Sequence, residues 1–231
     1  MLRKFYDLYI VASTEDIPKF LERGLKLGYR GIAISGLSIS TREKLEIDLN
    51  VEIISRLDLY FDRNIQAKRI LRKERRNFEI IVAHPKNVNA ARFSARDRRI
   101  DMINFHGNEH LFGPVQAKLM ANEGKILEVC LKRIRVLNKK SSLRTLFSII
   151  RRYYNMLTLA REMGVDVVCS SGASDPYEMH PPRDIAAFIS TLGLGDRAIY
   201  SLSKIPMSIV ERNRLKLSNK FIAPGVMLLD E

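Results

Sequence analysis

The sequence has few of the residues that build disulfides or membrane spans. It contains two cysteines, Cys130 and Cys169, each inside an apolar run, and no Cys-x-x-Cys pair. This pattern indicates buried thiols in a reducing compartment. No apolar run approaches the ~20 residues that a membrane-spanning helix needs. The basic and then apolar N-terminus is interrupted by Asp7, which is more typical of a first strand than of a signal peptide. We therefore expect a cytoplasmic protein with no membrane partner.

Metal ligands and catalytic motifs are also scarce. The chain has four histidines, namely His84, His106, His110 and His180. His106 and His110 are four residues apart, but the surrounding glycines and Gly113-Pro114 place them in a loop, and no His-x-His occurs. No Gly-x-Ser-x-Gly elbow surrounds Ser170 or Ser171. No Gly-x-Gly-x-x-Gly follows the first predicted strand. We expect no catalytic residue, no bound metal and no cofactor in this chain.

Positive charge, by contrast, is abundant. Lysine and arginine number 39 against 26 aspartates and glutamates, which gives a formal net charge of +13. A sequence pI of ≈ 9.9 is the electrostatic footprint expected of a nucleic-acid-binding domain. A generally charged surface would explain many charges but not so large an excess of one sign. The composition favours nucleic acid as the partner.

Short apolar, β-branched runs alternate with helical patterns along the whole chain. Seven strands are predicted, at 5–12, 29–35, 51–58, 78–85, 99–106, 126–134 and 165–172. Helices are predicted at 14–28, 62–76, directly after His84, at 141–164, 183–193 and 206–215. Such alternation implies a parallel sheet. We expect one TIM-barrel-like (β/α) barrel domain over residues 1–231, with an open doubly wound sheet as the alternative. Residues 221–230 could add an eighth strand or a closing segment.

Functional residues of such a barrel gather at the carboxyl ends of its strands. The residues at these ends are Ser35-Gly36, Arg56, His84-Pro85-Lys86, His106-Gly107, Lys132-Arg133 and Ser170-Ser171-Gly172. This set is polar and mostly cationic, with Asp58 as the main carboxylate. The turn at Ser171, Gly172 and Ala173 could offer backbone N–H groups to an anion, or could be a plain tight turn.

The cations around the fourth and fifth strands form the densest group. Arg92 and Arg96 are four residues apart and share one face of the predicted helix, and Arg98 and Arg99 follow. A guanidinium can bind two phosphate oxygens at once. Basic clusters also occur at 68–76, which is more typical of a solvated helix face, and at 132–140. Aromatic residues are sparse among the cations, so we expect contacts to RNA backbone and shape more than to stacked bases.

Three short motifs now resemble a known family. In order they are Ala90-Ala91-Arg92-Phe93-Ser94 with Arg99-Ile100-Asp101-Met102, then Ser170-Ser171-Gly172-Ala173, then Pro182-Arg183-Asp184-Ile185 before Leu192-Gly193. Together they resemble ribonuclease P protein component 3, the archaeal and eukaryotic p30-type subunit family. The resemblance spans nearly the whole chain and implies a TIM-barrel-like fold. It also implies a part in removing the 5′ leader from precursor tRNA, where the RNA subunit carries the catalytic site of this endonuclease.

The resemblance implies partners as well: the ribonuclease P RNA, precursor tRNA, ribonuclease P protein component 2 and the other protein subunits. There is one departure, because His180-Pro181-Pro182 stands where the family often has an arginine before its Ser-Pro pair. Related polymerase-and-histidinol-phosphatase barrels are metal hydrolases with His-x-His in the first strand. Here that strand is Tyr6-Asp7-Leu8-Tyr9, so those ligands are missing.

We therefore predict an RNA-binding subunit of ribonuclease P. The residues predicted to bind RNA are Lys86, Arg92, Arg96, Arg98, Arg99, His106, Lys132, His180, Arg183 and Lys204. One alternative is a stand-alone metal-dependent phosphoesterase that uses His84, His106 and His110. Another is a small-molecule enzyme with a phosphate site at the 171–173 turn, although an acid–base pair is missing. Tyr154 and Met156, on the helix at 143–163, are candidates for a protein-partner surface, but core packing is favoured for them.

Overall fold

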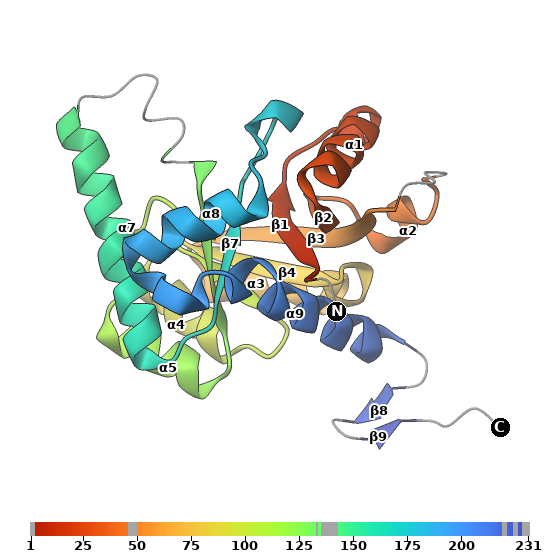
Figure 1. Ribbon diagram of the computed structural model, residues 1–231. Helices are drawn as coiled ribbons and strands as arrows, with labels where there is room; N and C mark the ends of the chain where they lie inside the picture. The colour runs from red at the N-terminus through yellow and green to blue at the C-terminus, as the bar shows by residue number, and fades with distance from the viewer. Residues whose placement is uncertain are drawn as a thin grey trace.

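A seven-stranded parallel sheet forms the body of the molecule (Figure 1). The computed structural model describes residues 3–45, 50–132, 134, 143–218, 221–223 and 226–227. The strands lie in chain order: β1 (Phe5–Ile10), β2 (Tyr29–Ser35), β3 (Glu52–Phe61), β4 (Ile80–Pro85), β5 (Met102–Asn104), β6 (Ile126–Cys130) and β7 (Val167–Ser170). Six of the seven predicted runs contain one of these strands, and β3 begins within the run at 51–58 but continues to Phe61.

The sheet curves until its first strand meets the segment that follows its last. A parallel bridge joins Ile10 to Ala173, and the backbone N–H of Val11 donates to the carbonyl of Ala173 at 2.9 Å. This pairing lies at the carboxyl ends of β1 and β7. The predicted TIM-barrel-like fold is therefore confirmed, as a nearly closed barrel, and the open doubly wound alternative is wrong.

Helices surround the sheet (Figure 1). They are α1 (Ile17–Leu27), α2 (Ile39–Arg42), α3 (Asn64–Glu74), α4 (Val88–Arg96), α5 (Pro114–Asn122), α7 (Leu143–Met163), α8 (Pro182–Ile189) and α9 (Lys204–Leu217). The predicted helices are confirmed with small shifts at their ends. The start of the 141–164 helix and the cluster at Arg133 and 135–140 lie outside the described residues. Helix α5 was not predicted, although Pro114 is its first residue, a position that proline favours.

The two ends of the barrel interior differ in chemistry. Toward the amino ends of the strands the interior is apolar and includes Tyr6, Ile80 and Ile126. Ile209 and Val210 of α9 pack into this cluster, and Arg214 of α9 binds the carboxylates of Glu52 and Glu79 at the starts of β3 and β4. Helix α9 thus fills the amino end of the barrel. Polar interior side chains lie toward the carboxyl ends.

The C-terminal segment does not extend the barrel. Strands β8 (Phe221–Ala223) and β9 (Val226–Met227) form a separate antiparallel pair, apart from the main sheet (Figure 1). The expectation of an eighth barrel strand is therefore wrong for the residues that the structure describes. Of the helices in these ranges, none combines the length and apolar character that crossing a membrane requires.

Candidate functional site

A buried guanidinium lies at the centre of the carboxyl end of the barrel. Arg56 of β3 is fully buried. Its Nη2 lies 2.7 Å from Oδ1 of Asp58, and its Nη1 and Nη2 lie 2.5 and 2.8 Å from the two carboxylate oxygens of Glu128. It also donates to the carbonyl of Leu8. Burial alone would lower the pKa of Arg56, but the charges of Asp58 and Glu128 raise it, so the group stays protonated.

The carboxylate of Glu128 on β6 accepts hydrogen bonds from side chains of three other strands. Besides Arg56, it accepts hydrogen bonds from Nδ2 of Asn104 on β5 and from Oγ of Ser170 on β7, both at 2.8 Å. Asn104 and Glu128 are register partners, so the side chains face each other across the β5–β6 pair. A buried carboxylate is tolerated only when it is paired and hydrogen-bonded in this way.

Asp58 is held in the same manner on the other side of Arg56. Its carboxylate accepts from Oγ of Ser35 on β2 at 2.6 Å and lies 2.7 Å from Nε2 of His84 on β4. Burial would raise the pKa of Asp58, but the Arg56 charge and the His84 hydrogen bond hold it well below its ordinary value. We call the set Ser35, Arg56, Asp58, His84, Asn104, Glu128 and Ser170 the Arg56 network.

Two tyrosines cover this network and form the barrel mouth. The Tyr9 ring centroid is 3.9 Å from the Arg56 guanidinium carbon. The Tyr60 ring stacks on the His84 imidazole with centroids 4.2 Å apart and an angle of 18° between planes. The two hydroxyls meet at 3.2 Å. Tyr60 is nevertheless 53% exposed, so its outer ring face is open to solvent.

The strand-end prediction needs correction at Arg56. We interpreted this end of the barrel as cationic with almost no carboxylate, whereas Arg56 is buried and paired with two carboxylates. Glu128 and Asn104 were missed because they lie inside apolar runs. A signal was present, since each is a polar residue inside an apolar run. Buried polar side chains of this kind need partners, which the neighbouring strands supply.

The predicted cations on α4 are divided by their partners. Arg92 and Arg96 are exposed, and within the described residues neither has an acidic partner. Arg98 is exposed as well. Arg99, in contrast, donates hydrogen bonds from its Nε and Nη2 to the two carboxylate oxygens of Asp97, at 2.9 and 2.6 Å. The free positive charge of this region therefore lies on Arg92, Arg96 and Arg98.

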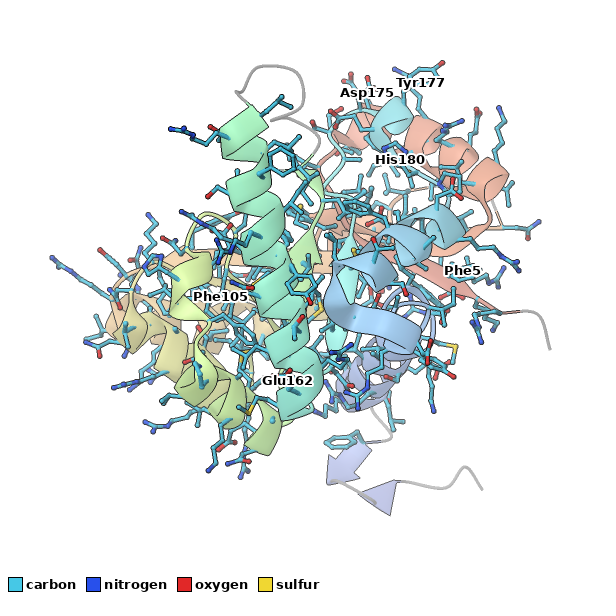
Figure 2. All side chains as sticks on the ribbon, turned by 60° about the vertical axis from the view of Figure 1, so that its left-hand side comes forward. Phe5, Phe105, Glu162, Asp175, Tyr177 and His180 are labelled. Carbon is cyan, nitrogen blue, oxygen red and sulfur yellow. The ribbon has the colours of Figure 1, made fainter. Side chains whose placement is uncertain are left out.

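The other residues predicted to bind RNA are spread over the two ends of the molecule. Lys86, His106 and Lys132 follow β4, β5 and β6 and lie around the barrel mouth. Arg183 is exposed in the first turn of α8, and His180 lies just before that helix. Figure 2 labels His180 near Asp175 and Tyr177. Lys204 begins α9, the helix at the opposite end. The structure does not gather the ten residues on one surface.

The turn predicted to bind an anion already holds a carboxylate of the same chain. The backbone N–H of Ser171 donates to Oδ1 of Asp7 at 3.1 Å, and that of Ala173 donates to Oγ of Ser171 at 3.1 Å. Asp7 is buried, and burial raises its pKa to about 6. Gly172 has a φ of +62°, and a Cβ there would lie 2.3 Å from Sγ of Cys130. Two of the turn's donors are therefore engaged inside the protein.

The histidines of the phosphoesterase alternative do not converge. His84 is buried against Asp58, while His106 and His110 are exposed. In the part of the chain that the structure describes, no group of three or more His, Cys, Asp or Glu residues is placed to hold a metal ion.

Comparisons with known proteins agree with one another. A family model described as RNase P subunit p30 matches residues 4–218. Ribonuclease P protein component 3 of Methanosarcina barkeri is 26% identical over 240 residues, covering 99% of this chain and 97% of the relative. That of Aeropyrum pernix is 28% identical over 193 residues, covering 81% and 87%.

Solved structures show the same fold. A chain in the cryo-EM structure of archaeal Ribonuclease P with mature tRNA superposes with a TM-score of 0.78 at 18% identity, covering 97% of this chain and 98% of that one. Histidinol phosphate phosphatase from Lactococcus lactis, complexed with zinc, L-histidinol and phosphate, gives 0.53 at 11% identity, covering 82% and 94%. At such identities the likeness concerns the fold alone.

Proposed function

This chain belongs to the RNase P subunit p30 family, and from that membership we propose that it binds RNA within ribonuclease P. Ribonuclease P activity, removal of the 5′ leader from precursor tRNA, is the function of the whole ribonucleoprotein. In the proposed role this subunit supports the catalytic RNA and supplies no catalytic residue. The Arg56 network is consistent with that role, because its charged groups are buried and each is bound by partners.

The proposed contacts with RNA phosphates are the exposed cations. The observation that carries this proposal is the pair Arg92 and Arg96, which lie one helical turn apart on the exposed face of α4 without an acidic partner in the described residues. Arg99 is expected to contribute less to RNA binding, because its guanidinium already donates hydrogen bonds to both carboxylate oxygens of Asp97. The remaining proposed contacts are Lys86, Arg98, His106, Lys132, His180, Arg183 and Lys204.

Salt dependence tests this proposal. Each phosphate contact contributes about −0.7 to −0.9 to the slope of log K against log salt concentration. Replacing Arg92 and Arg96 together with alanine should flatten the slope for the ribonuclease P RNA by about 1.4 to 1.8. Lys19→Ala is the matched control, since Lys19 is an exposed cation on α1 that is paired with Asp16 at 2.8 Å. Equal slopes for wild type and the double variant would refute the α4 contact.

Protein partners and location form the remaining part of the proposal. Precursor tRNA, ribonuclease P protein component 2 and the other protein subunits are the proposed partners, and the cytoplasm is the proposed location. On α7, Leu143 and Phe147 are 73% and 66% exposed and lie one turn apart, so they form an apolar patch suited to a protein contact. Tyr154 is about half exposed, whereas Met156 is buried in the core.

A further inference from the structure

The barrel mouth presents an aromatic ring that is both exposed and fixed. Tyr60 is 53% exposed, yet its inner face stacks on His84 and its hydroxyl contacts that of Tyr9. His84 is in turn bound to Asp58 at 2.7 Å. The ring is thus connected to the buried Arg56 network by a chain of direct contacts. An exposed side chain held this way loses little conformational freedom when a ligand stacks on it.

Cations flank the two tyrosines. Lys86 follows Pro85, and the backbone N–H of Lys86 donates to the carbonyl of Phe61 at 3.0 Å, which places it beside the strand end that carries Tyr60. On the other side, a Cβ at Gly172 would lie 3.1 Å from Cβ of Lys132 and 3.7 Å from the Tyr9 ring. Lys132 and Tyr9 therefore both lie close to Gly172. One lysine thus lies near Tyr60 and a second lies near Tyr9.

The charge beneath the rings favours a neutral ligand at this position. The Arg56 network contains one guanidinium and two carboxylates, and the carboxylate oxygens are covered by hydrogen bonds from Ser35, Asn104 and Ser170. A phosphate placed directly over it would face Asp58 and Glu128. A nucleobase carries no net charge and has a flat face that stacks on tyrosine. Phosphates on either side of the base would lie toward Lys86 and Lys132.

We propose that the barrel mouth binds one nucleobase of unpaired RNA, stacked on the exposed face of Tyr60, with the adjacent phosphates bound by Lys86 and Lys132. This site rests on the proposed RNA-binding function and adds a base contact to a protein predicted to contact RNA backbone and shape more than stacked bases. The sequence expectation of few stacking contacts followed from the sparse aromatic residues. The fold brings Tyr9, Tyr60 and His84 together from three strands.

Two probes of equal length separate stacking from charge: a short oligouridylate, and an abasic RNA with the same number of phosphates. Base stacking on an aromatic side chain accounts for about 5- to 150-fold in affinity. Tyr60→Ala should therefore weaken binding of the oligouridylate by that factor and leave the abasic RNA unchanged. Tyr60→Phe should retain the wild-type affinity for both. Lys86→Ala should weaken both probes alike.

A spectroscopic arm reports stacking directly. The chain contains no tryptophan, so Tyr60→Trp introduces a single tryptophan at the mouth, whose emission can be excited apart from that of the tyrosines. We expect the oligouridylate to quench its emission and the abasic RNA to leave it nearly unchanged. Quenching by both probes, or by neither while RNA still binds, would overturn the proposed site. Quenching by an arginine-rich peptide but not by the oligouridylate would also overturn it, in favour of a protein partner at the mouth.

The experiment distinguishes failure of this site from failure of the proposed function. If the function holds and the site does not, the ribonuclease P RNA binds with a steep salt dependence, and Tyr60→Ala equals wild type on every probe. If the function itself fails, wild type binds neither the oligomers nor the ribonuclease P RNA. Circular dichroism confirms that the Tyr60 variants are folded, and with Tyr60 half exposed, truncation leaves no buried cavity.

Discussion

Replacing Arg56 with methionine should cost a large share of the free energy of unfolding. Methionine replaces the aliphatic stem of the side chain but lacks the guanidinium, so Asp58 and Glu128 remain buried without the Arg56 charge. Breaking a buried ion pair by removing one partner costs about 3–5 kcal/mol. The whole free energy of unfolding of a domain is about 5–15 kcal/mol. We therefore expect a folded but much less stable protein.

Urea denaturation measures the effect. With a slope of about 2–3 kcal/mol per molar urea, the loss lowers the midpoint by about 1–2.5 M. Arg92→Met is the matched control, because Arg92 is exposed and has no acidic partner within the described residues. A surface substitution of this kind is expected to change stability by less than about 0.5 kcal/mol.

The pH dependence identifies the cause. In the wild type the pKa of Asp58 is held low, so its contribution to stability is present above its unfolded pKa and is lost only as pH falls through the folded value. In Arg56→Met the Arg56 charge no longer compensates for the burial of Asp58 and Glu128. Protonation of these two carboxylates therefore stabilises the folded variant. The stability difference should narrow between pH 7 and pH 4. A difference below about 1 kcal/mol, or one that stays constant with pH, would refute the reasoning.

Three further predictions concern other parts of the fold. Gly172→Ala should destabilise by about 1–3 kcal/mol, lowering the thermal midpoint by several degrees, because its Cβ meets Sγ of Cys130 at a positive φ. Asp7→Asn should gain about 2 kcal/mol of stability relative to wild type as pH rises from 4 to 6, because the wild-type carboxyl has a folded pKa of about 6 and its ionisation costs stability; parallel unfolding curves across that range would contradict this. Phe147→Asp should abolish co-elution with ribonuclease P protein component 2 without lowering the unfolding midpoint, whereas Ile65→Asp, an equally exposed change on α3, should leave co-elution intact.

The strands were predictable because parallel strands are buried on both faces and therefore form continuous apolar runs. Their ends were harder to place. The run at 99–106 yields a strand only over Met102–Asn104, since Arg99 is bound to Asp97 and Asp101 accepts from the backbone N–H of Ile81. Helix α5 was not predicted because Gly113-Pro114, at its start, is a pair typical of loops.

The register of the strands explains why the Arg56 network was not predicted. Ser35 lies opposite Arg56, and Asn104 opposite Glu128. These pairings depend on how far each strand is shifted along its neighbour. Loops and helices of different lengths precede the strands, so the sequence pattern does not fix that shift.

The register of the strands also determines whether an arginine is buried and paired or is exposed and able to contact RNA. Arg56 and Arg92 are the same residue type in neighbouring units of the fold, and composition counts them equally. Arg56 is buried between two carboxylates and is unavailable to RNA, while Arg92 is exposed and free of acidic partners in the described residues. The net charge of +13 indicates nucleic acid as a class of partner, but burial and pairing determine which cations can contact a phosphate. The same burial of Arg56 positions Tyr9 and Tyr60, so a cation that cannot touch RNA itself supports the ring on which we expect a base to stack.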